Sequence, residues 1–160
     1  MLLFESIAVY TKIVIWSIGK GCCICFFCDI MAWTLYDYVD ADGNNDFKAW
    51  SRSLQKPELA KLNRRLKALE DNGPALAPQM LAGPLAGYPH IYKLKMNGKV
   101  ALRPLLCKGP INNETEFTLL KGAFEVGNKW QPSSAPSEAV ARRGFVLNDP
   151  KRRTAHVKVL

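Results

Sequence analysis

YPHIYKLKMNGKVALRPLLCKGPINNETEFTLLKGAF, residues 88–124, is the stretch on which the predicted fold depends. Three of its segments have the alternating or continuously apolar pattern of β-strands: 91–96, 99–107 and 116–124. Asn97-Gly98, between the first two, is the strongest short signal for a β-hairpin. The second connection contains Gly109, Pro110 and two asparagines, which is typical of a loop. We therefore expect three consecutive antiparallel strands.

The two faces of this sheet are expected to differ in character. Successive side chains of a strand point to opposite faces, so the first strand separates apolar from basic residues. The two sets are Tyr92, Leu94 and Met96 on one face, Lys93 and Lys95 on the other. Residues 72–113 contain five basic side chains and no acidic one. This pattern predicts a sheet with one apolar face and one uniformly basic face.

The chain has 160 residues, enough for one domain with a substantial core. Its net charge is +8, and the excess is confined to the second half, since residues 1–71 balance to zero. Concentrated positive charge of this kind favours a polyanionic partner, with nucleic acid ahead of a membrane surface.

Cysteine usage argues against a metal site. Four of the five cysteines fall within seven residues, at Cys22, Cys23, Cys25 and Cys28. The cluster contains one pair with the spacing of metal ligands, Cys25-x-x-Cys28, but no second such pair and no nearby histidine. A structural zinc site needs four nitrogen or sulfur ligands. We predict no metal and no cofactor. The isolated Cys107 fits a buried strand position in a reducing, cytoplasmic protein.

Residues 1–30 form an apolar N-terminal extension unlike the rest of the chain. Four charged residues interrupt it, so its uninterrupted runs are shorter than the roughly 20 residues that cross a bilayer. An acidic Glu5 near the start and the lack of a small-residue cleavage site argue against a signal peptide. We favour an upstream extension of the reading frame before Met31. The alternative is a membrane anchor.

The segments around the three strands complete the predicted fold. Residues 33–39 alternate like a strand. Phe47, Trp50 and Leu54 then indicate a short helix, and a longer one is expected from Pro57 to Asn72. A third helix is predicted from Pro136 to about Phe145. The order of strand, helix, helix, three strands and helix predicts an α+β, two-layer domain over residues 31–147. Residues 148–160 are expected to be a mobile, basic tail.

Several motifs in this order resemble the RelE/HigB superfamily of toxins, and more narrowly its phage-derived HigB-like branch. The likeness extends from about Trp33 to Arg143. The motifs that carry it are Phe47-x-x-Trp50, Ala60-Lys-Leu-x-x-Arg-Leu66 with Asn72-Gly73, Leu85-x-Gly87, Ile91-Tyr-x-Leu-x-Met96, Arg103-x-Leu-Leu106 and Leu119-Leu-Lys-Gly-Ala-Phe124. The resemblance implies a RelE-like fold.

The resemblance also implies a function. Members of this superfamily are toxins of type II toxin–antitoxin systems, and most cut messenger RNA in the ribosome without a metal ion. Such cleavage requires activation of the ribose 2′-hydroxyl, stabilisation of charge on the phosphorus and protonation of the leaving oxygen. The implied partners are a cognate antitoxin, the ribosome and mRNA. The alternative is a non-enzymatic, gyrase-poisoning toxin of the ParE type, or a degenerate phage-derived binding module.

Transfer of the family pattern onto this chain gives a set of candidate residues. The catalytic candidates are Arg103, Lys95 and Lys121, and the RNA-binding candidates are Lys93, Lys99, Lys129, Arg142 and Arg143. No proton shuttle is evident beside them, because Tyr92 belongs to the apolar face and His90 precedes the strand. Pro104 predicts a strand edge or a bulge directly after Arg103. A register shift of one residue would exchange Lys95 and Leu94 between the two faces of the sheet.

Overall fold

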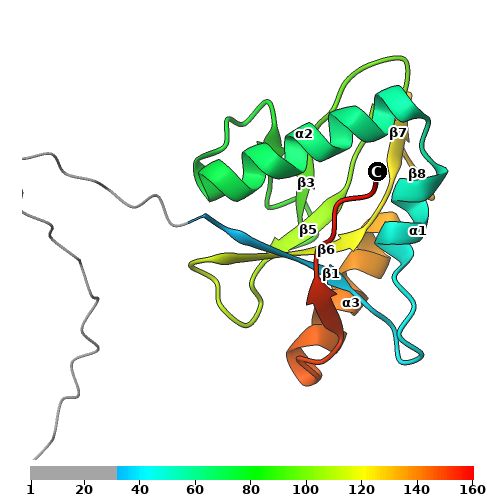
Figure 1. The fold of residues 1–160 in the computed structure, drawn as a ribbon. Helices are drawn as coiled ribbons and strands as arrows, with labels where there is room; N and C mark the ends of the chain where they lie inside the picture. Colours follow the sequence, from blue (N-terminus) through cyan, green and yellow to red (C-terminus); the bar gives the residue numbers. More distant parts are fainter. Residues whose placement is uncertain (1–31) are drawn as a thin grey trace, which may run out of the picture.

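The computed structural model describes residues 32–160, which form a mixed α+β domain with three α-helices and two β-sheets (Figure 1). The expectations for residues 1–30, including the extended reading frame and the membrane anchor, lie outside the described residues. The α+β class predicted from the sequence is confirmed.

The larger sheet has six strands in the order β2-β3-β5-β6-β1-β9. Their bounds are β1 Thr34–Tyr38, β2 Leu81–Ala82, β3 Tyr92–Leu94, β5 Leu105–Lys108, β6 Glu116–Lys121 and β9 Arg153–Ala155. β3, β5 and β6 are antiparallel neighbours, as predicted, and β1 runs parallel to β6. A parallel pair needs a long crossover, which α1 and α2 begin and the antiparallel strands complete.

A second, three-stranded sheet consists of β4 Ala101–Leu102, β7 Phe124–Val126 and β8 Lys129–Gln131. Two of the predicted strands are therefore each divided between the two sheets. The first divides at Arg103 and Pro104, and proline has no N–H for a ladder. The second divides at Gly122, where a β-carbon would overlap the ring of Trp50. The β7–β8 hairpin was not predicted. Its turn residues, Gly127 and Asn128, have φ angles of 54° and 62°.

The connection after β3 is longer than the sequence suggested. An isolated bridge joins Met96 to Leu102, so five residues separate the paired positions. The prediction of a tight two-residue turn at Asn97-Gly98 is wrong, although β3 and β5 do pair as antiparallel neighbours.

The helices are α1 Asp46–Ser53, α2 Lys56–Asn72 and α3 Ala135–Asn148, and a short 3-10 turn, η1 Gly73–Ala75, follows α2. α1 begins where the side chain of Asn45 accepts a hydrogen bond from the backbone N–H of Lys48, 2.8 Å away. At the start of α2 the Glu58 carboxylate accepts from the backbone N–H of Gln55 at 3.3 Å. The two predicted N-terminal helices are confirmed, and α3 extends to Asn148, beyond its predicted end.

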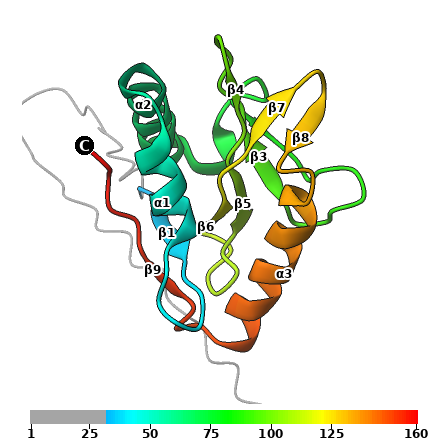
Figure 2. The same cartoon turned by 90° about the vertical axis from the view of Figure 1, so that its right-hand side faces the viewer.

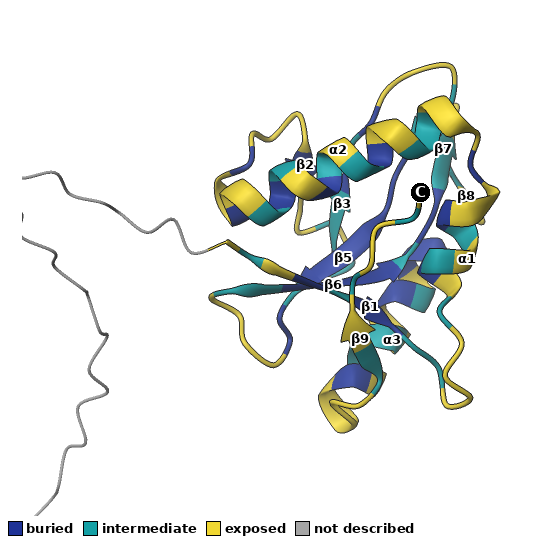
Figure 3. Cartoon of the chain, in the orientation of Figure 1, coloured by how far each residue is buried: buried dark blue, intermediate teal, exposed yellow. Residues whose placement is uncertain are grey.

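Helices cover both faces of the six-stranded sheet, which is the main departure from the predicted two layers (Figure 2). α1 and α2 pack on one face through a core that includes Phe47, Leu62 and Leu66. α3 packs on the other through Ala139 and Val146. Each fully buried leucine of these clusters contributes about 1.5–3 kcal/mol of transfer free energy. The dark interior in Figure 3 follows these two clusters.

Tyr92, Leu94 and Met96 pack in the α1–α2 cluster, as alternation predicted. The expectation of a uniformly basic second face is wrong, because Ile91, Leu105, Cys107 and Leu120 are buried there under α3. Cys107 is buried on β5, so its predicted place as a buried strand residue is confirmed. This burial raises the pKa of its thiol to about 12.

The C-terminal residues belong to the sheet, so the prediction of a mobile tail is wrong. β9 pairs antiparallel with β1. Beyond it, the His156 backbone N–H donates to the carbonyl of Leu35 at 2.9 Å, and the His156 ring lies 2.8 Å from the Asp37 carboxylate. Asn63 of α2 donates to the carbonyl of Val159 at 2.9 Å. The terminus therefore ends beside α1 and α2 (Figure 1).

Candidate functional site

Three residues form a row across β3, β5 and β6 on the face that α3 covers. Lys93 is paired with Leu105, and Leu105 is paired with Lys121. Strands in a sheet are about 4.8 Å apart, so the backbones of the two lysines lie about 10 Å from each other. Leu105 packs in the α3 cluster, which identifies the face to which the row belongs.

A bulge turns Lys121 toward this face. Leu119 packs in the α1–α2 cluster and Leu120 in the α3 cluster, so strict alternation would return Lys121 to the α1–α2 side. The β5–β6 register shifts between Leu105 and Leu106, and Leu120 is the extra residue on β6. Bulges of this kind redirect side chains. The Lys121 ammonium consequently lies 2.7 Å from the Glu138 carboxylate of α3.

Glu125 of β7 is the centre of one ion-pair cluster beside the row. Its carboxylate lies 2.5 Å from Arg103 Nε and 3.6 Å from Lys93 Nζ. The Lys93 ammonium also lies 5.0 Å from the ring centroid of Trp130, within cation–π range. Burial alone would raise the pKa of Glu125, but the hydrogen bond from Arg103 and the charge of Lys93 outweigh it and lower the pKa. The carboxylate is therefore ionised at neutral pH.

Arg103 is only 8% exposed, and most of its donors are used within the fold. Besides the contact with Glu125, one terminal nitrogen donates to the backbone carbonyls of Met96 at 3.2 Å and Leu102 at 3.0 Å. The other donates to Asn97 Oδ1 at 3.0 Å. Arg103 thus fixes the connection between β3 and β4 and holds Glu125 in place. Contact with a phosphate would require these bonds to open.

A second ion-pair cluster joins α1, β6 and α3. Lys121 contacts Glu138 and lies 3.9 Å from Asp46, and Arg142 contacts the same Asp46 carboxylate. Arg142 also donates to the backbone carbonyl of Leu120 at 2.9 Å. Hydrogen bonds from Lys121 and from Ser134 lower the pKa of Glu138 despite its partial burial.

The two clusters give this face an alternation of charge. Four cations, Lys93, Arg103, Lys121 and Arg142, oppose three carboxylates, Asp46, Glu125 and Glu138. Sequence reasoning singled out all four cations but none of the carboxylates as their partners. Only the pair of Glu138 and Arg142, 3.7 Å apart and four residues apart on α3, has a spacing that the sequence could indicate. The other contacts are remote in sequence, since Arg103 and Glu125 are 22 residues apart and Asp46 and Arg142 are 96 apart.

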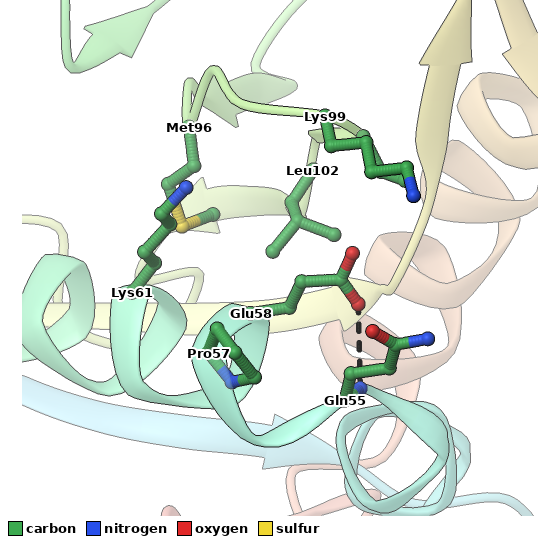
Figure 4. A pocket seen from close by; sticks show the side chains of 8 residues that line it. Gln55, Pro57, Glu58, Lys61, Met96, Lys99 and Leu102 are labelled. Carbon is green, nitrogen blue, oxygen red and sulfur yellow. Dashed lines mark hydrogen bonds between the residues drawn. The ribbon is translucent and has the colours of Figure 1, made fainter.

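The other predicted residues lie outside these clusters. The Lys95 ammonium donates to the backbone carbonyl of Pro78 at 3.3 Å. Lys129 is exposed on β8. Lys99 lines a cavity of about 180 Å³ between the start of α2 and the β3–β4 connection, with Glu58 and Lys61 across from it (Figure 4). The structure therefore does not bring these three lysines into contact with Glu125.

Arg143, His90 and Tyr92 also lie away from Glu125. Arg143 lines a separate cavity with His90 and Tyr92. Tyr92 packs partly against the α1–α2 cluster, as expected, and His90 is exposed ahead of β3. Neither side chain takes part in a contact with the Glu125 carboxylate. Among the described residues, Glu125 is the one carboxyl group in that cluster.

Comparison with protein-family models, with curated proteins and with solved structures returned no match. Within residues 32–160 no three His, Cys, Asp or Glu side chains gather where they could hold a metal ion. None of the helices in the same range has the length and apolarity to cross a membrane.

Proposed function

We propose that the protein is the toxin of a type II toxin–antitoxin pair and cleaves messenger RNA on the ribosome. One observation carries the proposal: Lys93 and Lys121 flank Leu105 in one row, with the ionised Glu125 beside Lys93. The resemblance of the sequence to the RelE/HigB superfamily supports it, as do the basic excess of the second half and the order of the elements. We further propose that an antitoxin holds the toxin inactive.

The chemistry follows from the roles that these side chains can take. The ammonium groups of Lys93 and Lys121 can bind a backbone phosphate and stabilise the charge that develops on it during attack. The Glu125 carboxylate can accept the proton of the ribose 2′-hydroxyl, and the Lys121 ammonium can donate a proton to the leaving 5′ oxygen. Trp130 offers a ring on which a base can stack once Lys93 engages the phosphate. Arg103 acts as a positioning residue because it holds Glu125.

The decisive experiment is induced expression of the full chain in bacteria, with growth followed and mRNA 5′ ends mapped together. We expect growth arrest and new cuts within translated messages. Lys121→Met should lower the cleavage rate roughly 100-fold, the usual effect of removing one group that stabilises transition-state charge. Arg64→Gln is the control, because this substitution also removes one positive charge, from an exposed site on α2. Full cleavage by a folded Lys121→Met protein would exclude the proposed site.

A second candidate is the non-enzymatic class, a gyrase-poisoning toxin or a binding module. The observation that favours it is the engagement of Arg103, whose buried donors are satisfied within the fold. This class predicts arrest with DNA breaks and intact messages, or no arrest at all. The same expression experiment therefore separates the two candidates. An Arg103→Ala variant is less informative than the sequence suggested, because this geometry predicts that it destabilises the fold.

A further inference from the structure

A second group of basic side chains lines a cavity at the opposite end of β3 and β5 from Arg103. The cavity has a volume of about 230 Å³ and is lined by His90, Tyr92, Lys108, Asn113 and Arg143. The β3–β5 ladder stops at the pair Tyr92–Leu106, so Lys108, two residues further along β5, has no partner on β3. The cavity lies where that ladder ends.

The backbone adopts an uncommon conformation at His90, two residues before the pair at which the ladder stops. His90 has a φ of 69°, in the left-handed region that side-chain-bearing residues seldom adopt. Residues held in this region occur disproportionately at ligand sites, where the surrounding structure maintains the strain. On the other side, Asn113 packs against Gly109, whose φ of 65° allows the loop to fold back toward Lys108.

The lining has the composition of an anion site. It contains one lysine, one arginine, one histidine and two neutral groups that can hydrogen-bond, and it contains no carboxylate. Arg143 Nε is buried and has no hydrogen-bond partner among the described residues. Native proteins normally provide a hydrogen-bond partner for a buried polar group. Nothing within residues 32–160 supplies an acidic partner to Lys108 or Arg143.

We propose that this cavity binds a phosphate group. Arginine and lysine are the usual ligands of phosphate oxygens, and the Tyr92 hydroxyl and Asn113 amide can donate to the remaining oxygens. The volume is below the roughly 300–1,000 Å³ of pockets for drug-sized ligands, so it suits a phosphate rather than a whole nucleotide. The phosphate can be free or can be the 5′ end of an RNA. The inference does not depend on the proposed endonuclease activity.

The test is calorimetric titration of the full-length protein with inorganic phosphate at constant ionic strength. We expect saturable binding that weakens about tenfold or more in Arg143→Gln, since a charge-assisted hydrogen bond and its cation are lost. Arg64→Gln, which removes the same charge from an exposed site on α2, should bind phosphate as the wild type does. Absence of saturable binding, or equal weakening by both variants, would overturn the proposal.

Amide NMR shifts of the wild-type protein provide a measurement that needs no variant. Phosphate should shift the amides of His90 and Asn113 before those of Glu125 and Trp130. Shifts confined to the Glu125 cluster would overturn the proposal even if Arg143→Gln failed to fold.

Two RNA oligonucleotides of one sequence, with a 5′-phosphate or a 5′-hydroxyl, identify the source of the phosphate. Tighter binding of the phosphorylated RNA, lost in Arg143→Gln, supports an RNA end as the ligand. Equal binding of the two RNAs together with saturable binding of inorganic phosphate supports a free phosphate. All of these readouts measure binding alone, so they stand whether or not the protein cleaves messages.

Discussion

The Glu125 cluster and the His90 cavity contain similar basic side chains in opposite electrostatic settings. Around Glu125, the ammonium of Lys93 and the guanidinium of Arg103 each have a carboxylate partner. Around His90, Lys108 and Arg143 have none in the part of the chain that the structure describes. A count of basic residues therefore does not locate the positive charge that a ligand meets first. To bind a phosphate, Lys93 and Lys121 must exchange a carboxylate partner for it, whereas Lys108 and Arg143 have no such contact to give up among the described residues.

The largest loss of stability should come from removing the Glu125 carboxylate, which Lys93 and Arg103 share. Glu125→Gln leaves the buried Arg103 cation without its partner, and breaking such a pair costs about 3 kcal/mol of unfolding free energy. Urea denaturation followed by circular dichroism measures this loss. Glu114→Gln, in an exposed loop, removes the same charge and should change stability by less than about 0.5 kcal/mol. Equal stability of the two variants would show that Glu125 does not neutralise Arg103.

Acid should weaken the Glu125 and Glu138 ion pairs. The pKa values of Glu125 and Glu138 are lowered from 4.5 in the folded protein, so the unfolded chain binds these protons more readily. Their contribution to stability is complete above 4.5 and is lost as the pH falls through the lower, folded-state values. Urea denaturation between about pH 6 and pH 3 should show this decline.

The double variant Glu125→Gln/Glu138→Gln provides the check on this pH dependence, and its stability should decline less steeply. Some slope will remain, because hydrogen bonds from Asn44 also lower the pKa of Asp40. An unchanged slope would mean that other carboxyl groups produce the acid sensitivity.

A smaller loss is expected at Lys121. Lys121→Met keeps most of the side-chain length but removes the contacts with Glu138 and Asp46, at a cost of about 1 kcal/mol for a partly exposed pair. Lys129→Met is the control, because Lys129 is exposed on β8. The same urea measurement applies. If Lys129→Met proved equally destabilising, the effect would reflect net charge rather than the contact with α3.

The smallest loss of stability should come from Lys108, which has no acidic partner among residues 32–160. Its ammonium lies 5.7 Å from the ring centroid of Trp33, so Lys108→Met should cost no more than about 0.5 kcal/mol. The same substitution should nevertheless weaken phosphate binding in the calorimetric titration. A loss of stability as large as that of Lys121→Met would show that Lys108 is already neutralised and would remove the contrast between the two sites.

The sequence predicted the features that depend on neighbouring residues. The strand at residues 33–39, the two N-terminal helices and the antiparallel order of β3, β5 and β6 all follow from local periodicity and turn residues. The position of α3 on the opposite face of the sheet does not follow from such local signals. Its buried side chains include Ala135 and Ala139, which give too weak an apolar stripe to indicate a second covered face.

The same distinction applies to the site and to β9. The cations could be identified by type, but their partners lie on other elements and are set by tertiary packing. Lys121 reaches α3 only because a bulge changes its register, and a bulge depends on the paired strand. β9 is three residues of a polar segment, Arg153–Ala155, and becomes a strand only because β1 offers it an edge.

The position of β1 has a consequence for protein synthesis. β1 is near the start of the described chain, but both of its neighbours are late: β6 begins at Glu116 and β9 ends at Ala155. At roughly 5–20 residues per second, a ribosome needs several seconds to make the 117 residues from Val39 to Ala155. Until those residues exist, β1 lacks at least one of the two strands with which it pairs in the folded sheet. The six-stranded sheet can therefore close only after synthesis has passed Ala155.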